Sequence, residues 1–278
     1  MGNVSRPRLD TEDKKLLEYI AKYGFVDMCF VYKFYKTNCR RDTVERRIMQ
    51  LVKHKLLLAE KMFVPHNYVL TGKDGYKALT LDRLGLEMME AMGFDVTDYR
   101  KTMKDSASYR VYHQVQVATL CESMSKNFNE NEKLFRVKMI LSEKDACLPE
   151  RNNQPDAILI FERTDNTPGC IAIFVELERS YTSKNLIHSK LASYATVIRD
   201  KSYKKHLKLP IVAQRVLFAS QTDSQIETIK KKIEASPFAE EIEILVAKYS
   251  EACERSLESI YEQPKTNKKY KLLQNMQK

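Results

Sequence analysis

The chain has 278 residues, of which 43% are hydrophobic and 30% are charged. This length has room for two domains with separate cores, and the composition is typical of a globular protein. No apolar run is long enough to span a bilayer, so membrane insertion is not expected, and the N-terminus lacks the apolar core of a signal peptide. The formal net charge of +10 favours a polyanionic partner, most simply nucleic acid. The six cysteines include no C-x-x-C pair, which argues against a zinc finger and favours free thiols in a cytoplasmic protein.

Residues 1–95 carry the pattern of a small helical domain with a hairpin. Apolar periodicity predicts helices at 10–22, with Thr11 as the cap, at 26–36 and at 43–55. Two strand-like pieces follow at 57–63 and 68–70, joined through Pro65-His66-Asn67, and a further helix is expected at 80–92. Three helices followed by a β-hairpin resemble a winged helix-turn-helix, so we interpret 1–95 as a winged-helix DNA-binding domain.

The third of these helices is rich in groups that bind DNA. A recognition helix places its N-terminal residues against base edges in the major groove, where arginine can contact guanine with two hydrogen bonds. The alternative is an exposed, merely soluble helix face on which Glu45 pairs locally. The helix pattern around it favours DNA binding. The predicted DNA-binding residues are Arg40, Arg41, Thr43, Arg46, Arg47 and Gln50.

Residues 105–250 read as an α/β domain, and the chain as a whole as α+β. A long helix is expected at 107–127, and later helices at 183–199 and 224–235. Near-continuous apolar runs predict buried strands at 134–141, 157–161, 171–175, 216–220 and 242–247. The order α-β-β-β-α-β is that of a restriction-endonuclease-like core. Residues 251–278 are expected to form a basic C-terminal tail.

Carboxylates mark the ends of two central strands in this domain. Asp156 opens the strand at 157–161, and Glu176 and Glu178 close the next one. Acids brought together repel one another unless a cation lies between them, and hard oxygen ligands suit Mg²⁺ or Mn²⁺. Each acid taken singly is as readily explained by a turn or a surface ion pair. Their joint order favours a metal site formed by Asp156, Glu176 and Glu178.

The segments P-D-A-I-L-I-F and F-V-E-L-E-R-S, with K-L-A-S-Y on the following helix, resemble the replication-relaxation family of plasmid proteins. That family joins a winged helix to a PD-(D/E)xK-type nuclease domain, and one branch is similar to the MobC relaxases. The resemblance implies that Asp156 and Glu176 bind the metal, with the Leu177 carbonyl as a further ligand. It also implies double-stranded plasmid DNA at an origin of transfer as the substrate, and accessory mobilisation and coupling proteins as partners.

The sequence departs from that family pattern at one position. Glu178 stands where the catalytic lysine is usual, and Lys190 on the next helix is the expected replacement. Three roles remain open for Glu178: binding the metal, bridging to it through water, or holding Lys190. Tyr194, four residues after Lys190, lies on the same side of that helix and, with Tyr181, is a candidate nucleophile, although packing is the commoner role of a tyrosine.

These patterns together predict a cytoplasmic, metal-dependent DNA endonuclease that nicks an origin of transfer to begin plasmid mobilisation by conjugation. The predicted catalytic residues are Asp156, Glu176, Glu178, Lys190 and Tyr194. The alternative is a noncatalytic winged-helix replication or transfer regulator whose nuclease fold is degenerate. Glu178 in the lysine position favours that alternative, and the intact acids favour the enzyme.

Overall fold

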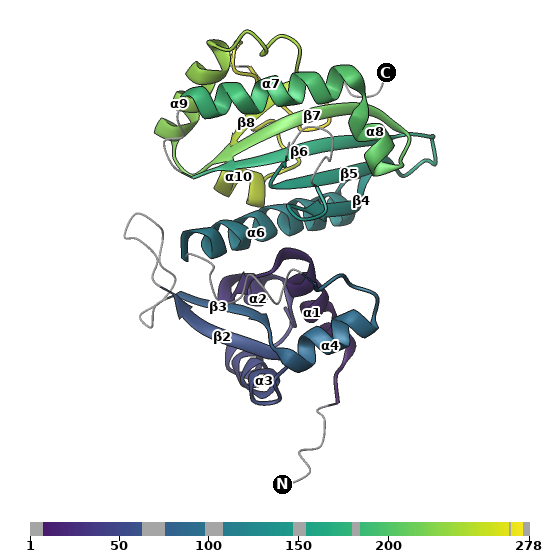
Figure 1. The fold of residues 1–278 in the computed structure, drawn as a ribbon, viewed down its shortest axis with the longest axis vertical. Helices are drawn as coiled ribbons and strands as arrows, with labels where there is room; N and C mark the ends of the chain where they lie inside the picture. The colour runs from purple at the N-terminus through teal and green to yellow at the C-terminus, as the bar shows by residue number, and fades with distance from the viewer. Residues whose placement is uncertain are drawn as a thin grey trace. The chain divides into compact units, whose positions relative to one another are not determined.

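The computed structural model describes residues 8–62, 76–97, 108–146, 154–179, 184–266 and 268–274. It divides into two compact units, Met1–Ala118 and Thr119–Lys278, and the division falls within one helix, α6 (Ser108–Asn131). The secondary structure is a mixture of helices and two sheets, as an α+β protein requires (Figure 1). Within the described residues, no helix has the length and apolar character needed to cross a membrane.

The N-terminal unit packs helices around a small antiparallel sheet with strand order β1-β3-β2. The apolar faces of the first helices form its core, in which Leu16, Ile20, Phe30 and Leu51 have no exposed surface. The elements before α6 are α1 (Thr11–Tyr23), β1 (Val26–Asp27), α2 (Met28–Phe34), α3 (Arg41–Lys53), β2 (Leu57–Met62), β3 (Tyr76–Leu81) and α4 (Arg83–Ala91).

Three details of this unit differ from the sequence prediction. Asp10, not Thr11, caps α1, because its carboxylate accepts from the Asp13 amide while Asp13 accepts from the Asp10 amide in a capping box. The strand that pairs with β2 is Tyr76–Leu81, so the expected helix at 80–92 begins only at Arg83. The strand expected at 68–70 and the turn before it lie outside the described residues.

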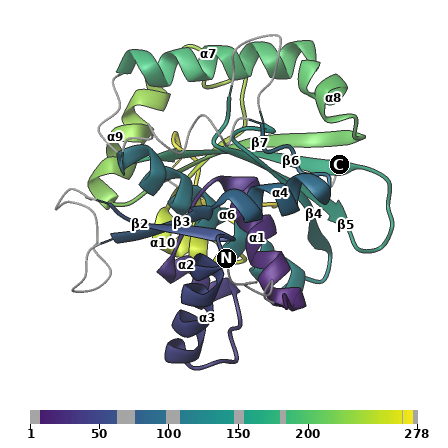
Figure 2. The same ribbon diagram turned by 60° about the horizontal axis from the view of Figure 1, so that its bottom comes forward.

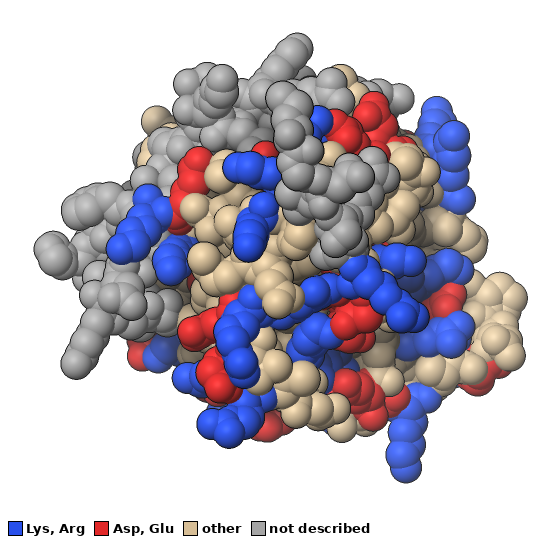
Figure 3. Space-filling model, turned by 90° about the horizontal axis from the view of Figure 1, so that it is seen from below, with Lys and Arg blue, Asp and Glu red and all other residues tan. Residues whose placement is uncertain are grey.

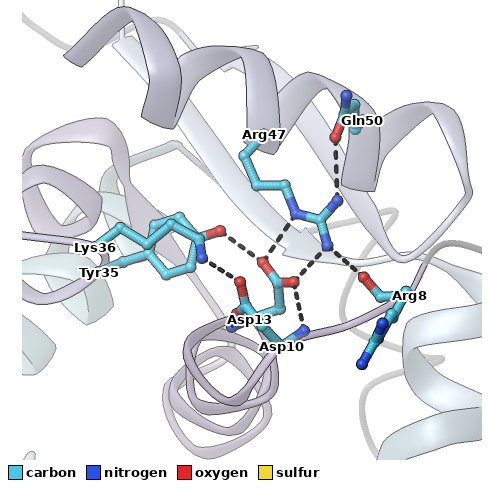
Figure 4. A network of polar contacts seen from close by, with 7 residues as sticks. All are labelled: Arg8, Asp10, Asp13, Tyr35, Lys36, Arg47 and Gln50. Atoms are coloured by element: carbon cyan, nitrogen blue, oxygen red, sulfur yellow. Dashed lines mark hydrogen bonds and ion pairs between the residues drawn. The ribbon is translucent and has the colours of Figure 1, made fainter. Parts of the chain in front are cut away.

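A polar network in this unit is centred on the Asp13 carboxylate, which has no exposed surface (Figure 4). The Tyr35 hydroxyl donates to Asp13 at 2.6 Å, and the Arg47 guanidinium of α3 donates to both oxygens of the same carboxylate. Burial raises the pKa of Asp13, but the hydrogen bonds from Arg47 and Tyr35 lower it by more, so the net direction is downward. The network therefore ties α1, α2's end and α3 together through one ionised acid.

Replacing Tyr35 with phenylalanine should test how much this network stabilises the unit. The variant keeps the buried ring but leaves one lone pair of an ionised, buried carboxylate without its donor, so we expect a loss of about 1.5–3 kcal/mol in the free energy of unfolding. Urea denaturation of the full chain would measure it. Tyr32→Phe is the matched control, since its hydroxyl also donates to a carboxylate, that of Glu45, but at an exposed site. Equal losses in both variants would contradict the assignment.

The C-terminal unit is built on a seven-stranded mixed sheet with strand order β10-β9-β8-β7-β6-β5-β4. The pairs β6·β7 and β7·β8 are parallel, and the others are antiparallel. The expected order α-β-β-β-α-β is observed, with one extra short helix after α7. The strands are β4 (Phe135–Ser142), β5 (Ala157–Arg163), β6 (Cys170–Glu178), β7 (Ile211–Ser220), β8 (Ile244–Lys248), β9 (Tyr261–Glu262) and β10 (Lys269–Tyr270). The helices after α6 are α7 (Lys184–Asp200), α8 (Ser202–Leu207), α9 (Asp223–Glu234) and α10 (Tyr249–Glu254).

The two faces of this sheet bury different side chains. Ile158, Ile160 and Phe174 belong to a core shared with α7 and α9, and α7 runs along that face of the sheet in both ribbon views (Figures 1 and 2). Phe161, from the opposite face, packs its ring against Phe128 of α6. Every residue of β6 is buried. Strands covered on both faces carry near-continuous apolar runs, which explains why β5 and β6 could be found from sequence.

The segment expected to be a basic tail contributes α10, β9 and β10 to this unit. Tyr261 and Leu272 have no exposed surface. Arg215 of β7, itself buried, donates to the backbone carbonyls of Leu272 and Gln274 and pairs with Glu243. The composition of this segment does not reveal these contacts, because the few apolar residues that anchor it are spread among lysines.

Candidate functional site

The predicted acids meet where β5 begins and β6 ends. The antiparallel register pairs Ala157 with Val175, so Asp156, one residue earlier, falls beside Glu176. Glu176 and Glu178 alternate with Leu177 and so share the sheet face of Phe174, toward α7. Both glutamates are buried, whereas Asp156 is partly exposed. Burying two glutamates on one strand face is costly unless a partner compensates their charge.

Lys190 supplies that partner from α7. Its ammonium lies 2.6 Å from Glu176 Oε2 and 2.7 Å from Glu178 Oε1, and its side chain keeps 27% of its surface exposed. One turn further along the same helix, the Tyr194 hydroxyl donates to Glu176 Oε1 at 2.6 Å. The spacing of four residues brings both groups to the acids, as the sequence predicted. The cluster reaches solvent through Lys190 and the partly exposed Asp156.

Burial dominates the protonation of this cluster. Desolvation raises the pKa of Glu176 to about 7, with Asp156 adding to the rise and Lys190 opposing it. Burial lowers the pKa of Lys190, but the carboxylates of Glu176, Glu178 and Asp156 more than offset this, so the net direction is upward. Lys190 is therefore cationic at neutral pH, and Glu176 is poised to change its charge there.

The donor chemistry of the cluster suits a hard cation, but with fewer ligands than the sequence predicted. Within the described residues, no three acid, histidine or cysteine side chains are grouped so that they could hold a metal together. The reason is that the Lys190 ammonium takes the place between Glu176 and Glu178. Asp156 and Glu176 remain as a pair, and Mg²⁺ typically binds through one or two carboxylates while keeping several waters. Asp156 is held for this by the Leu177 amide, which donates to its Oδ2 at 2.7 Å.

Tyr194 lies in the cluster but is fully buried. Desolvation and the nearby Glu176 carboxylate raise the pKa of its phenol well above the usual value. A neutral phenol without exposed surface is a poor nucleophile toward a phosphate in solution. Its contact with Glu176 instead orients that carboxylate. The other tyrosine considered, Tyr181, lies outside the described residues.

The predicted DNA-binding residues of α3 fall into two groups. Arg40, Arg41, Thr43, Arg46 and Gln50 have exposed side chains. Arg41 lies over the Tyr32 ring, 5.0 Å from its centroid, while Arg46 is 74% exposed. Figure 3, seen from the end where α3 lies in Figure 1, shows lysine and arginine side chains gathered on that face, interleaved with acids.

Arg47 is instead partly buried, with 20% of its side-chain surface exposed. Its guanidinium contacts Asp13, the Arg8 carbonyl at 2.8 Å and Gln50 Oε1 at 3.0 Å (Figure 4). These contacts leave it tied across the unit rather than directed outward. The sequence held no signal for this pairing, because an acid in the first turn of a helix is equally explained by the helix dipole.

Fold and site together define an α+β protein with a buried acid–lysine cluster at the end of a central strand. No protein-family model matches the sequence, and no curated protein matches it. Among solved structures, restriction endonuclease FokI is similar over 87% of this chain and 42% of its own, with 11% identity and a TM-score of 0.32. The structure of FokI bound to DNA is similar over 87% of this chain and 43% of its own, with 11% identity and a TM-score of 0.29. The chain thus spans less than half of either, and these values are too low to assign a fold or an activity.

Proposed function

We propose that this protein is a metal-dependent DNA endonuclease whose catalytic cluster is Asp156, Glu176, Glu178 and Lys190. The observation that carries the proposal is the meeting of Glu176 and Glu178 with the partly exposed Lys190 at the end of β6, with Asp156 beside Glu176 in the register of β5 and β6. A structural ion pair needs one acid for one lysine. The further acids supply carboxylate oxygens of the kind that a divalent cation binds.

In this proposal Asp156 and Glu176 hold a magnesium or manganese ion, which polarises the scissile phosphate when bound. Lys190 holds both Glu176 and Glu178 in place through its hydrogen bonds to their carboxylates. An ammonium has three N–H donors, and the carboxylates named here accept two of them, so the third can bind a phosphate oxygen. Glu178 then has the third of its open roles, holding Lys190. Tyr194 orients Glu176, which favours hydrolysis over a tyrosine-linked intermediate.

The proposed DNA contacts come from the exposed residues of α3. Arg40, Arg41 and Arg46 present positive charge on one helix, with Thr43 and Gln50 as neutral hydrogen-bonding groups among them. Such a helix can hold phosphates and read base edges in a duplex. We further propose a winged-helix role for this unit, and nicking at a plasmid origin of transfer as the biological reaction. That narrower relaxase function rests on the family resemblance of the motif segments.

A noncatalytic DNA-binding regulator is the second candidate. It is favoured by one observation: Lys190 and the two glutamates already form a closed, buried ion cluster at 2.6 and 2.7 Å. On this interpretation the cluster only fastens α7 to β6. The two candidates differ in whether a divalent cation makes the protein cleave DNA.

Metal removal separates them. We expect the full chain to convert supercoiled plasmid to the nicked form with Mg²⁺ or Mn²⁺, to stop when EDTA is added, and to resume when the cation is restored in excess. The reason is that carboxylates alone supply no Lewis acid to polarise the phosphoryl oxygen. Gel electrophoresis of a plasmid carrying a candidate origin, beside one without it, measures both cleavage and site preference. DNA binding without cleavage under every divalent cation would favour the regulator.

Replacing Arg46 with alanine should weaken binding to duplex DNA about 10-fold, the loss expected for one charged contact. Fluorescence anisotropy at fixed salt would measure it, and the salt dependence should become shallower because one phosphate or base contact is lost. Arg83→Ala is the matched control: its side chain is 72% exposed, close to the 74% of Arg46, and each arginine pairs with an acid four residues away on its own helix, but Arg83 lies on α4. Equal weakening by both would assign the effect to overall charge and contradict a specific role for α3.

A further inference from the structure

The C-terminal end of β6 is also held by side chains of β7 and α9. Ser220, paired with Glu178 in the parallel register, donates its hydroxyl to the Glu178 carbonyl at 2.5 Å. The Gln225 Nε2 amide of α9 donates to the next carbonyl, that of Arg179, at 2.9 Å. The carbonyl of the last residue of β6 and the carbonyl that follows it therefore each accept a hydrogen bond from a side chain.

Gln225 is fixed for this contact by the turn that begins α9. Its side-chain Oε1 accepts from the backbone amide of Thr222 at 3.1 Å, and its backbone amide donates to Thr222 Oγ1 at 3.2 Å. The two hydrogen bonds together form a capping box. Oε1 also lies 3.1 Å from Ser220 Oγ. Because the acceptor end of the side-chain amide is used within the turn, its donor end is directed at β6. A capping box needs only the acceptor, so the bond to Arg179 is additional to helix capping.

We propose that Gln225 is a positioning residue for the catalytic cluster: it fixes the backbone that follows Glu178 and thereby the direction in which Glu178 meets Lys190. This inference rests on the proposed nuclease function. Lys190 reaches Glu178 at its carboxylate from α7, while Ser220 and Gln225 hold the backbone behind it. Residues that orient a site in this way typically change activity about 10- to 100-fold when replaced.

Two substitutions at one position separate the donor from the acceptor. Gln225→Glu keeps the acceptor that closes the capping box, since glutamate serves there as well as glutamine, but loses the donor to Arg179. Gln225→Met is neutral and loses both. Thr222→Ala is the control, because it removes the cap hydroxyl from the same turn without altering the donor to Arg179. Each full-length variant would be compared for nicking kinetics with Mn²⁺ and for thermal unfolding.

We expect both Gln225 variants to lower kcat about 10-fold or more while the KM for plasmid stays within about 2-fold, and Gln225→Glu to unfold near the wild-type temperature. Thr222→Ala should unfold earlier yet nick at close to the wild-type rate. Wild-type rates in Gln225→Met would overturn the proposal, as would slowing in all three variants that follows their loss of stability. Slowing in Gln225→Glu alone would also overturn it, by assigning the effect to the added charge. If the wild-type protein fails to cleave DNA with every divalent cation tried, the nuclease function itself fails, and the bond to Arg179 is a strand-end cap only.

Discussion

Replacing Asp156 with asparagine should slow nicking of supercoiled DNA by about 10³-fold, equivalent to roughly 4 kcal/mol of transition-state stabilisation. Asparagine has nearly the same shape, and its side-chain carbonyl can still accept from the Leu177 amide as Asp156 Oδ2 does at 2.7 Å. The fold should therefore survive while one of the two carboxylates proposed to hold the metal loses its charge. A single-turnover nicking assay across a range of Mn²⁺ concentrations would measure the change.

Asp165→Asn is the control for this experiment. Asp165 is an exposed acid on the connection between β5 and β6, paired with Arg163, and it takes no part in the cluster. It should nick at the wild-type rate and bind DNA equally well. If Asp156→Asn nicks as fast as Asp165→Asn, the carboxylate assigned to the metal is the wrong one.

The second large effect is on stability. Lys190→Met should lower the free energy of unfolding by about 3–5 kcal/mol at pH 8, because it leaves Glu176 and Glu178 buried without their cation. Chemical denaturation of the full chain, followed through the unfolding transition of the C-terminal unit, would measure the loss. Lys205→Met, a change of the same kind on the short helix α8, should have a much smaller effect. An unchanged stability would mean that Lys190 does not compensate the pair.

The loss should shrink as the pH is lowered. The ordinary pKa of a glutamate is 4.5, and that of Glu176 in the folded protein is already raised to about 7 by burial. Removing the ammonium raises it further. Above about pH 7 the folded variant therefore keeps a proton that the folded wild type releases, so the loss caused by the substitution grows as the pH rises above 7. Below about pH 7 both folded proteins hold the proton, and the loss levels off at its smaller value. Mn²⁺ should also restore stability at pH 8 if the freed carboxylates accept a cation, because a ligand that binds only the folded state stabilises it.

The strands that form the site could be predicted from sequence because burial on both faces leaves an unbroken apolar run, as in β5 and β6. The meeting of Lys190 and Tyr194 with the acids was predictable for a similar reason, since helical spacing is a local property. In contrast, the pairing of Arg47 with Asp13 joins residues far apart in the chain, and nothing in either neighbourhood marks it. The same is true of Ser220 and Gln225, which act on backbone carbonyls. A carbonyl is present at every residue, so a pattern of side chains does not reveal which one is held.

The arrangement of the acids predicted as metal ligands depends on a contact that the sequence does not reveal. Sequence places Glu176 and Glu178 on one strand face, but it does not decide which cation lies between them. In the structure the group between them is the Lys190 ammonium. The candidate DNA-binding residues of α3 divide in a comparable way, because exposure separates Arg46 from Arg47, whereas their positions along the helix are adjacent.

The buried Arg215 has a consequence for how the C-terminal unit is completed during synthesis. Its partners, the carbonyls of Leu272 and Gln274, are made more than fifty residues after it, and a buried guanidinium is costly until they arrive. β7 can pair with β6 as soon as both have left the ribosome, but the surroundings of Arg215 stay incomplete until residues 272–274 have followed. A lysine-rich segment thus completes this part of the unit because its backbone carbonyls, rather than its side chains, accept hydrogen bonds from a buried guanidinium.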